Sequence, residues 1–294
     1  NFLAPDAYAW TTFALPYHDA VRPNGPPLYS QNRAEWERQA RDIVDYSASL
    51  SDVPKMLAEF WADGPDTTAP PGHWYKIAMD ACVNERLSLV ETVKVLFLVG
   101  HALNDAGVAS WDAKRHFDFI RPITMIQCGF GGQTVDAWAG PYLGVGTVFA
   151  SQWQPYQATT FVTPAFPGYV SGHSTFSAAA SLALEKYFGR EYLAPKCHLI
   201  PEGVSLFERR IDAGKPGYIP GLTDVPNNGP RTKGYAPGTD VVLCWEHWKD
   251  AGLESGISRF HGGIHILADH VDGVDMGYQI AEMVFQRSLS YWGA

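Results

Sequence analysis

The sequence predicts a mainly α-helical protein with long irregular loops. Apolar residues recur at helical spacing over several segments, of which residues 88–111 and 263–289 are the longest. By contrast, no alternating strand pattern exceeds a few residues, apart from a weak candidate at 145–149. No linker divides the helical segments. We therefore expect one helical domain over residues 31–294, preceded by an irregular, proline-rich arm over residues 1–30.

The composition describes an ordinary globular protein and excludes some classes of partner. Of the 294 residues, 46% are hydrophobic and 18% are charged. The net charge of -9 argues against nucleic acid or an anionic membrane surface as the general partner. No apolar run reaches transmembrane length. The four cysteines form no CxxC motif, so neither zinc nor a redox centre is indicated, and one or two disulfides remain open.

The first half of the chain reads as an arm followed by helices. Pro16, Pro23, Pro26 and Pro27 prevent long helices in the arm. Helical spacing then begins at Asn32, and a second helix is expected from Leu50 to Trp61. Residues 63–72 contain three prolines and two glycines and are predicted to be a loop. Two more helices are expected over residues 73–87 and 88–111, the second continuing towards Phe119.

The second half alternates irregular stretches with helices. Residues 123–164 and 190–240 are rich in glycine and proline and show little periodicity. Between them a helix is predicted to begin after Ser171 and to end at Gly189. Helical patterns return over residues 241–256 and 263–289. Long loops within a compact domain usually carry function.

The loop before the central helix is the first candidate site. Ser171 occupies the predicted N-cap, where the following backbone N–H groups have no intrahelical partner and the helix dipole is positive. Gly172 lets an anion approach the backbone, and His173 exchanges a proton near neutral pH. Alone, this stretch is better interpreted as an ordinary capped helix with an incidental histidine.

A second segment supplies two cations. Lys114 and Arg121 are seven residues apart, about two helical turns, so both are expected on one face of a helix that Pro122 ends. The alternative is a solvated basic face.

A third segment combines Arg259 with His265 and Asp269, which are spaced i and i+4 on a predicted helix. The carboxylate is expected to fix the imidazole tautomer. A buried structural histidine is the plain alternative. A metal site of His261, His265 and Asp269 is disfavoured, because two glycines follow His261 and place it in the preceding loop.

Together the three segments provide three cations, a helix N-terminus and two histidines. This set suits a tetrahedral oxyanion such as phosphate or vanadate, held by many donors while a ring nitrogen attacks or ligates its centre.

The order of these motifs resembles the signature of the phosphatidic acid phosphatase type 2 superfamily, which includes vanadium-dependent haloperoxidases and acid phosphatases. The motifs are Lys114-x6-Arg121-Pro122, Ser171-Gly172-His173 and Arg259-x5-His265-x3-Asp269. The segments around these motifs, among them FWADGPDTTAPPGHW and WDAK, resemble the corresponding segments of the haloperoxidase branch of the superfamily. The resemblance covers about residues 50–285. Val170 departs from the proline that many members have there.

The resemblance implies a helical bundle that binds vanadate, or phosphate in the same place. His265 would ligate vanadium, backed by Asp269, while His173 would act as acid–base. The oxygens would be held by the side chains of Lys114, Arg121, Arg259 and Ser171 and by the N–H of Gly172. Lys114 would also polarise bound peroxide. Trp111 and Phe166 match the halide pocket of chloroperoxidase-like members.

The implied reaction is oxidation of bromide, with chloride as a second halide, by hydrogen peroxide, followed by halogenation of an organic acceptor. The alternative on the same frame is a soluble acid phosphatase that forms a phosphohistidine at His265. A non-catalytic oxyanion-binding protein is a third reading. The resemblance also favours a secreted or periplasmic location, because this location is common in the family. Family members are commonly longer at the N-terminus. A homo-oligomer is compatible with the sequence.

Overall fold

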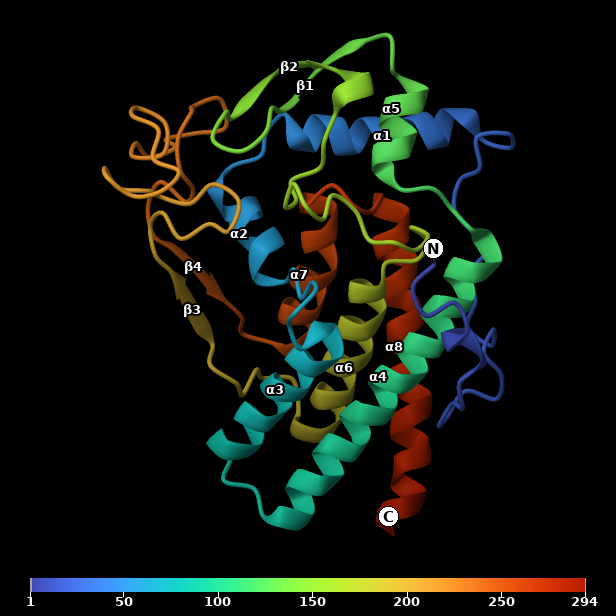
Figure 1. The fold of residues 1–294 in the computed structure, drawn as a ribbon. Helices are drawn as coiled ribbons and strands as arrows, with labels where there is room; N and C mark the ends of the chain where they lie inside the picture. The colour runs from blue at the N-terminus through green and yellow to red at the C-terminus, as the bar shows by residue number, and fades with distance from the viewer. Residues whose placement is uncertain (1, 294) are drawn as a thin grey trace.

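A computed structural model describes residues 2–293, and these are mainly helical, as predicted. The described residues form eight α-helices (Figure 1): α1 Arg33–Ser47, α2 Asp52–Phe60, α3 Ala69–Asn84, α4 Leu89–Phe117, α5 Pro122–Gly129, α6 Gly172–Phe188, α7 Trp248–His261 and α8 Leu267–Trp292. They also form two two-stranded antiparallel sheets: β1 Thr134–Trp138 with β2 Val145–Phe149, and β3 Cys197–Ile200 with β4 Val241–Cys244. The expected strand at 145–149 is therefore confirmed.

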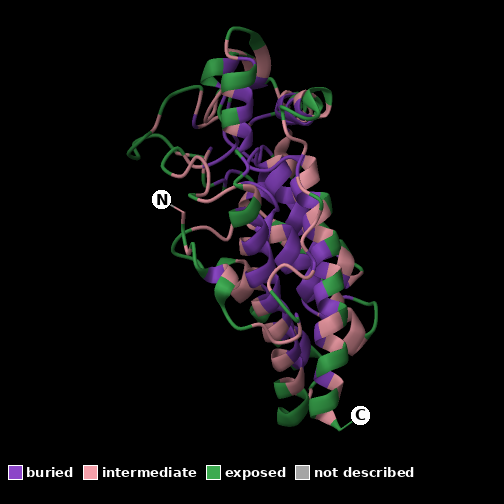
Figure 2. Cartoon of the chain, turned by 90° about the vertical axis from the view of Figure 1, so that its right-hand side faces the viewer, coloured by how far each residue is buried: buried purple, intermediate pink, exposed green. Residues whose placement is uncertain are grey.

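Helix α6 lies at the centre of the bundle and contacts α3, α4, α7 and α8. Its alanines at 178, 179, 180 and 183 are fully buried, and such small side chains let neighbouring helices approach closely. A Cβ at Gly277 of α8 would lie 2.5 Å from the Thr175 carbonyl oxygen, so glycine is required there for this packing. Figure 2 shows that the buried residues concentrate along the inner faces of the long helices.

Local capping explains where the best-predicted helices begin. The Ser171 hydroxyl accepts the Ser174 N–H at 3.3 Å, and Gly189 ends α6, as expected. Ser88 forms a capping box with Glu91 at the start of α4. The Asn32 side chain accepts the Glu35 N–H at the start of α1.

The prediction that Lys114 and Arg121 share one helix is wrong. Helix α4 ends at Phe117, because Asp118 adopts a left-handed conformation with φ 42°. Arg121 lies beyond this break, as the N-cap of α5, whose first residue is Pro122. Helix α5 itself falls in a stretch that was expected to be irregular. The two cations are brought together by a turn of the chain.

Three other predictions, about residues 241–269, differ from the structure. Residues 241–244 form β4, paired with β3 and joined to it by a disulfide between Cys197 and Cys244, and α7 begins only at Trp248. His265 precedes α8 by two residues, so it does not lie on a helix with Asp269 as predicted. His261 is the last residue of α7, and was wrongly expected in a loop. Short apolar runs such as 241–244 fit strand and helix equally well.

The same kind of error occurs at α3, which begins at Ala69 and not at His73. Prolines 70 and 71 lie in its first turn, where a missing N–H costs nothing.

The proline-rich arm lies along α4 (Figure 1). The Asp105 carboxylate accepts the N–H groups of Phe13, Ala14 and Leu15 at 2.6, 2.6 and 3.0 Å. The Arg22 guanidinium donates to Asp112 at 2.6 and 2.8 Å. Acidic side chains of α4 thus fix a segment that makes few backbone hydrogen bonds of its own.

Within residues 2–293, no helix combines the length and the apolar character that crossing a membrane requires.

Candidate active site

Four parts of the chain meet at the N-terminal end of α6. They are the end of α4, the turn before α5, the loop 166–171 and the connection from α7 to α8. The polar side chains that they contribute are almost fully buried: Lys114 0%, Arg121 6%, Ser171 0%, Arg259 1%, His265 3% and Asp269 1% exposed. Residues far apart in sequence thus form one buried polar cluster, which we call the candidate site.

Arg121 joins two of these parts. Its Nε donates to the Phe166 carbonyl at 3.0 Å, and its Nη1 donates to the Ile264 carbonyl at 2.8 Å. Its Nη2 is buried and has no partner among the described residues. Burial lowers the pKa of Arg121 to about 10, while the Asp269 carboxylate opposes the shift. An unpaired, buried guanidinium N–H is a donor available to an anion.

The surroundings of His265 determine its tautomer. Its Nε2 lies 2.9 Å from Arg121 Nη1, and its Nδ1 lies 2.7 Å from Asp269 Oδ2. A guanidinium only donates, so Nε2 carries the lone pair and Nδ1–H donates to the carboxylate. Burial, followed by the charges of Arg121 and Lys114, holds the pKa of His265 well below its ordinary value. His265 is therefore a neutral imidazole whose lone pair faces the cations.

Lys114 holds the loop before α6. Its ammonium group donates to the carbonyls of Pro167, Gly168 and Val170 at 2.9, 2.9 and 2.5 Å. An ammonium has three N–H donors, and all three are used here. Burial and the nearby Arg121 hold the pKa of Lys114 well below its ordinary value. Lys114 contacts an oxyanion only by exchanging one of these carbonyls, a constraint that sequence alone did not reveal.

His173 and Arg259 form the other side of the site. His173 lies in the first turn of α6, and its Nε2 is buried without a partner. Burial and then Arg259 lower the pKa of His173 to about 3, so the ring is neutral at pH 7. Arg259 donates to Ser258 Oγ and to the Ala58 carbonyl. Burial lowers its pKa to about 10, and Asp63 opposes the shift.

One carboxylate near the site was missed by sequence reasoning. The charge of Asp63 acts to raise the pKa values of both His173 and Arg259. In the sequence Asp63 precedes Gly64 and Pro65 and reads as a turn residue. The one indication of a function for Asp63 in the sequence was that it lies within the segment FWADGPDTTAPPGHW, which resembles haloperoxidases.

The site carries an excess of positive charge. Lys114, Arg121 and Arg259 are all buried, and burial is the largest cause that lowers each pKa. The carboxylates that oppose these shifts are Asp269, which acts on Lys114 and Arg121, and Asp63, which acts on Arg259. Burial raises the pKa of Asp269, which weakens it further as a counter-charge. An anion bound here would complete the charge balance.

The residues predicted for the halide pocket also lie together. The rings of Trp111 and Phe166 are 5.1 Å apart. The Lys114 ammonium and the Arg121 guanidinium each lie 5.1 Å from the centre of the Phe166 ring. The indole N–H of Trp111 donates to the Leu3 carbonyl at 3.0 Å, so the arm covers this aromatic pair.

His261 takes no part in this cluster through its ring. It stacks on Tyr46 with ring centres 4.8 Å apart, and its buried Nδ1 has no partner. Among the described residues, no group of three or more His, Cys, Asp or Glu side chains is arranged to hold a metal ion.

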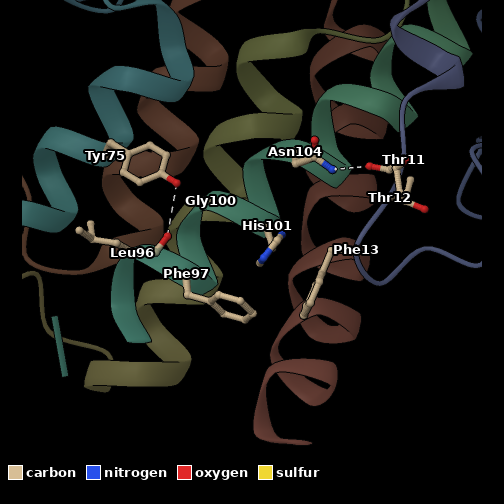
Figure 3. A pocket seen from close by; sticks show the side chains of 9 residues that line it. All are labelled: Thr11, Thr12, Phe13, Tyr75, Leu96, Phe97, Gly100, His101 and Asn104. Carbon is tan, nitrogen blue, oxygen red and sulfur yellow. Dashed lines mark hydrogen bonds between the residues drawn. The ribbon is translucent and has the colours of Figure 1, made fainter. Parts of the chain in front are cut away.

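A separate concavity of about 510 Å³ lies between the arm, α3 and α4 (Figure 3). Phe13, Phe97 and His101 line it, together with Thr11, Thr12, Tyr75, Leu96, Gly100 and Asn104. None of these is a predicted site residue. This concavity is therefore not part of the candidate site.

The candidate site fits vanadate or phosphate on its own chemistry. Arg121 Nη2 and His173 Nε2 are buried donors or acceptors without partners. Gly172 and His173 present N–H groups that an α-helix leaves without intrahelical partners. His265 offers a neutral ring nitrogen among cations. A helical bundle with such a site has the architecture of the vanadium haloperoxidase and acid phosphatase class.

Comparisons with known proteins identify the family within this class to which the chain belongs. Residues 94–294, more than half of the chain, match the family model described as the VCPO second helical-bundle domain. The chain belongs to this family, which is a vanadium haloperoxidase family. It is also 27% identical over 142 residues to the vanadium chloroperoxidase of Curvularia inaequalis, covering 44% of this chain and 22% of that protein.

Two solved structures share the fold. The holo-type bacterial vanadium-dependent chloroperoxidase aligns with a TM-score of 0.80 at 22% identity, over 100% of this chain and 56% of that one. A bacterial vanadium-dependent iodoperoxidase aligns with a TM-score of 0.69 at 23% identity, over 97% of this chain and 57% of that one. The chain therefore spans between a fifth and three fifths of the length of these relatives.

Proposed function

We propose that this protein is a vanadate-dependent haloperoxidase that oxidises bromide, and chloride as a second halide, with hydrogen peroxide. The hypohalous product would halogenate an organic acceptor. The observation that carries the proposal is the buried excess of three cations around a neutral His265, with Arg121 Nη2 and His173 Nε2 unpartnered. The relatives, which include a chloroperoxidase and an iodoperoxidase, support halide chemistry.

Each predicted residue has a role that its contacts support. His265 Nε2 would hold the vanadium centre, and Asp269 would keep the ring in the required tautomer. The guanidinium groups of Arg121 and Arg259 would bind the oxygens, assisted by the N–H groups at the start of α6. Bound vanadate supplies a Lewis acid that activates peroxide without changing oxidation state.

Three residues would manage protons and charge. His173, neutral in the free site, would accept a proton from hydrogen peroxide and later return it to the departing oxygen. Lys114 would add positive charge and, by exchanging one loop carbonyl, contact an oxygen. The Ser171 hydroxyl, which caps α6, would assist as a further donor. Trp111 and Phe166 would wall the halide approach.

The acid phosphatase alternative uses the same groups differently. His265 Nε2 would attack phosphorus, and His173 would protonate the leaving alcohol. The lone pair at Nε2 supports either chemistry. We also propose a secreted or periplasmic location, because the disulfide between Cys197 and Cys244 suits an oxidising compartment.

A paired assay on one oxyanion-free preparation tests the proposal. Half is loaded with orthovanadate and assayed for bromination of a dione with hydrogen peroxide, and half is assayed for hydrolysis of an aryl phosphate. We expect vanadate-dependent bromination that phosphate suppresses and that His265→Ala reduces at least about 1,000-fold. Phosphate release that vanadate inhibits, without halogenation, would establish the phosphatase instead.

A further inference from the structure

Residues 61–63, which we call the wall, follow α2 and lie beside the helix that carries His173. The Trp61 ring stacks on the Trp74 ring, with centres 6.1 Å apart, and the Trp74 indole N–H donates to Ser177 Oγ of α6. The carbonyl groups of Trp61 and Ala62 and the carboxylate of Asp63 all act to raise the pKa of His173. Asp63 has a left-handed backbone, with φ 43°, a conformation that aspartate adopts more readily than most residues with a side chain.

His73 makes the contacts that fix this wall. Its Nδ1 lies 3.0 Å from Asp63 Oδ1 and 3.1 Å from Asp63 Oδ2. Its ring packs against the Trp61 ring, with centres 4.8 Å apart. The side chains of His73 and Asp63 are 18% and 10% exposed, so little water competes for this hydrogen bond.

Helix α3 gives His73 a fixed position relative to the site. The next residue, Trp74, is fully buried, and its indole N–H donates to Ser177 Oγ at 2.9 Å. Ser177 lies on α6, one turn beyond His173. The helix that carries His173 and the helix that carries His73 are thus tied together, and His73 is tied in turn to Asp63.

We propose that His73 is a positioning residue for His173, acting through the Asp63 carboxylate and the wall of residues 61–63. It does not touch the predicted reacting atoms. The effect of His73 on turnover rests on the proposed function, in which His173 is the acid–base. The effect of His73 on the position of residues 61–63 does not depend on that function. The charged groups that act on His173 are Asp63 and Arg259, and His173 in turn acts on His265. His198 of β3 lies beside His73.

Two variants separate the hydrogen bond from simple ring packing. His73→Phe keeps an aromatic ring against Trp61 but has no donor for Asp63. His73→Asn loses the ring but keeps an N–H donor near the position of Nδ1. A merely structural role would make the aromatic variant the milder one, whereas the proposed role makes the asparagine variant the milder one.

The decisive experiment is a double-mutant cycle on the vanadate-loaded enzyme with His73→Phe and Asp63→Asn. We expect His73→Phe to lower kcat about tenfold, with KM for peroxide changed less than about twofold, and His73→Asn to recover most of the loss. Because His73 acts through Asp63, the double variant should be no slower than Asp63→Asn alone. Losses that multiply, or a milder phenylalanine variant, would overturn the proposal.

A second measurement needs no activity. Amide hydrogen exchange over residues 61–66 should quicken in His73→Phe and recover in His73→Asn, with α8 unchanged as the internal control. Unchanged exchange over residues 61–66 in His73→Phe would overturn the proposal. If the wild type shows no turnover at all, the proposed function fails, and the exchange result still decides whether His73 holds the wall. Should His73→Phe not fold, His73→Met replaces it as the donor-free variant in both measurements.

Discussion

Two buried ionic clusters in this molecule differ in one respect, the balance of charge. Lys55 of α2 and Glu208, each with a side chain 1% exposed, form an ion pair at 2.6 Å. The other Glu208 oxygen accepts the Trp138 indole N–H at 2.9 Å and the Tyr142 backbone N–H at 3.0 Å. The Lys55 ammonium and both Glu208 oxygens therefore all have a partner. In the candidate site three buried cations face the carboxylates of Asp63 and Asp269, and among the described residues Arg121 Nη2 and His173 Nε2 remain without a partner.

The difference separates a structural cluster from a binding site. The Lys55–Glu208 pair joins α2 to the irregular stretch around residue 208 and requires nothing further. In the proposed function, a bound anion would complete the charge balance of the candidate site. Burial of charge alone is therefore a poor sign of function, whereas a buried excess of one sign with free donors is a good one.

The largest effect on stability is expected where the paired cluster is broken. Glu208→Gln leaves the Lys55 ammonium buried without a counter-charge, so the free energy of unfolding should fall by about 3–5 kcal/mol. Urea unfolding checks this. The double variant Lys55→Met with Glu208→Leu should lose less, because no charge is left unpaired. A loss below about 1 kcal/mol for Glu208→Gln would contradict the comparison.

A smaller effect concerns protons near the candidate site. Burial lowers the pKa of His270 to about 4, against an ordinary value of 6.5. Between these values the unfolded chain binds more protons, so His270 lowers stability as the pH falls from about 6.5 towards 4. The slope from one such histidine is at most about 1.4 kcal/mol per pH unit.

His270→Asn, which keeps a partner for Ser174 Oγ at the present Nδ1 contact of 3.0 Å, should flatten the acid side of the stability curve by up to this amount. The measurement is urea unfolding at pH 7, 6 and 5 in oxyanion-free buffer. An unchanged slope would mean that the buried ring does not titrate on unfolding. Asp269 contributes with the opposite sign, because burial raises its pKa.

Sequence reasoning succeeded where the signals were local. Ser171 as N-cap and Gly189 as the end of α6 follow from capping preferences that act within a few residues. Candidate residues from three separate segments could be grouped because a buried oxyanion requires cations, donors and a nucleophilic nitrogen together.

It failed where the tertiary structure decides the local one. The left-handed Asp118 places Arg121 outside α4, and the pairing of β4 with β3 overrides the apolar pattern at 241–244. The three carbonyls around Lys114 and the action of Asp63 on His173 depend on loops whose paths no periodicity predicts.

We propose that the excess of positive charge makes the candidate site an oxyanion site. Calorimetric titration of orthovanadate into the wild type and into Arg121→Met measures this binding. The account predicts one saturable site in the wild type, an affinity about 100-fold lower in Arg121→Met, which is about 2.7 kcal/mol, and an unchanged affinity in Glu208→Gln. Absence of saturable binding, or an affinity in Arg121→Met equal to that of the wild type, would contradict it.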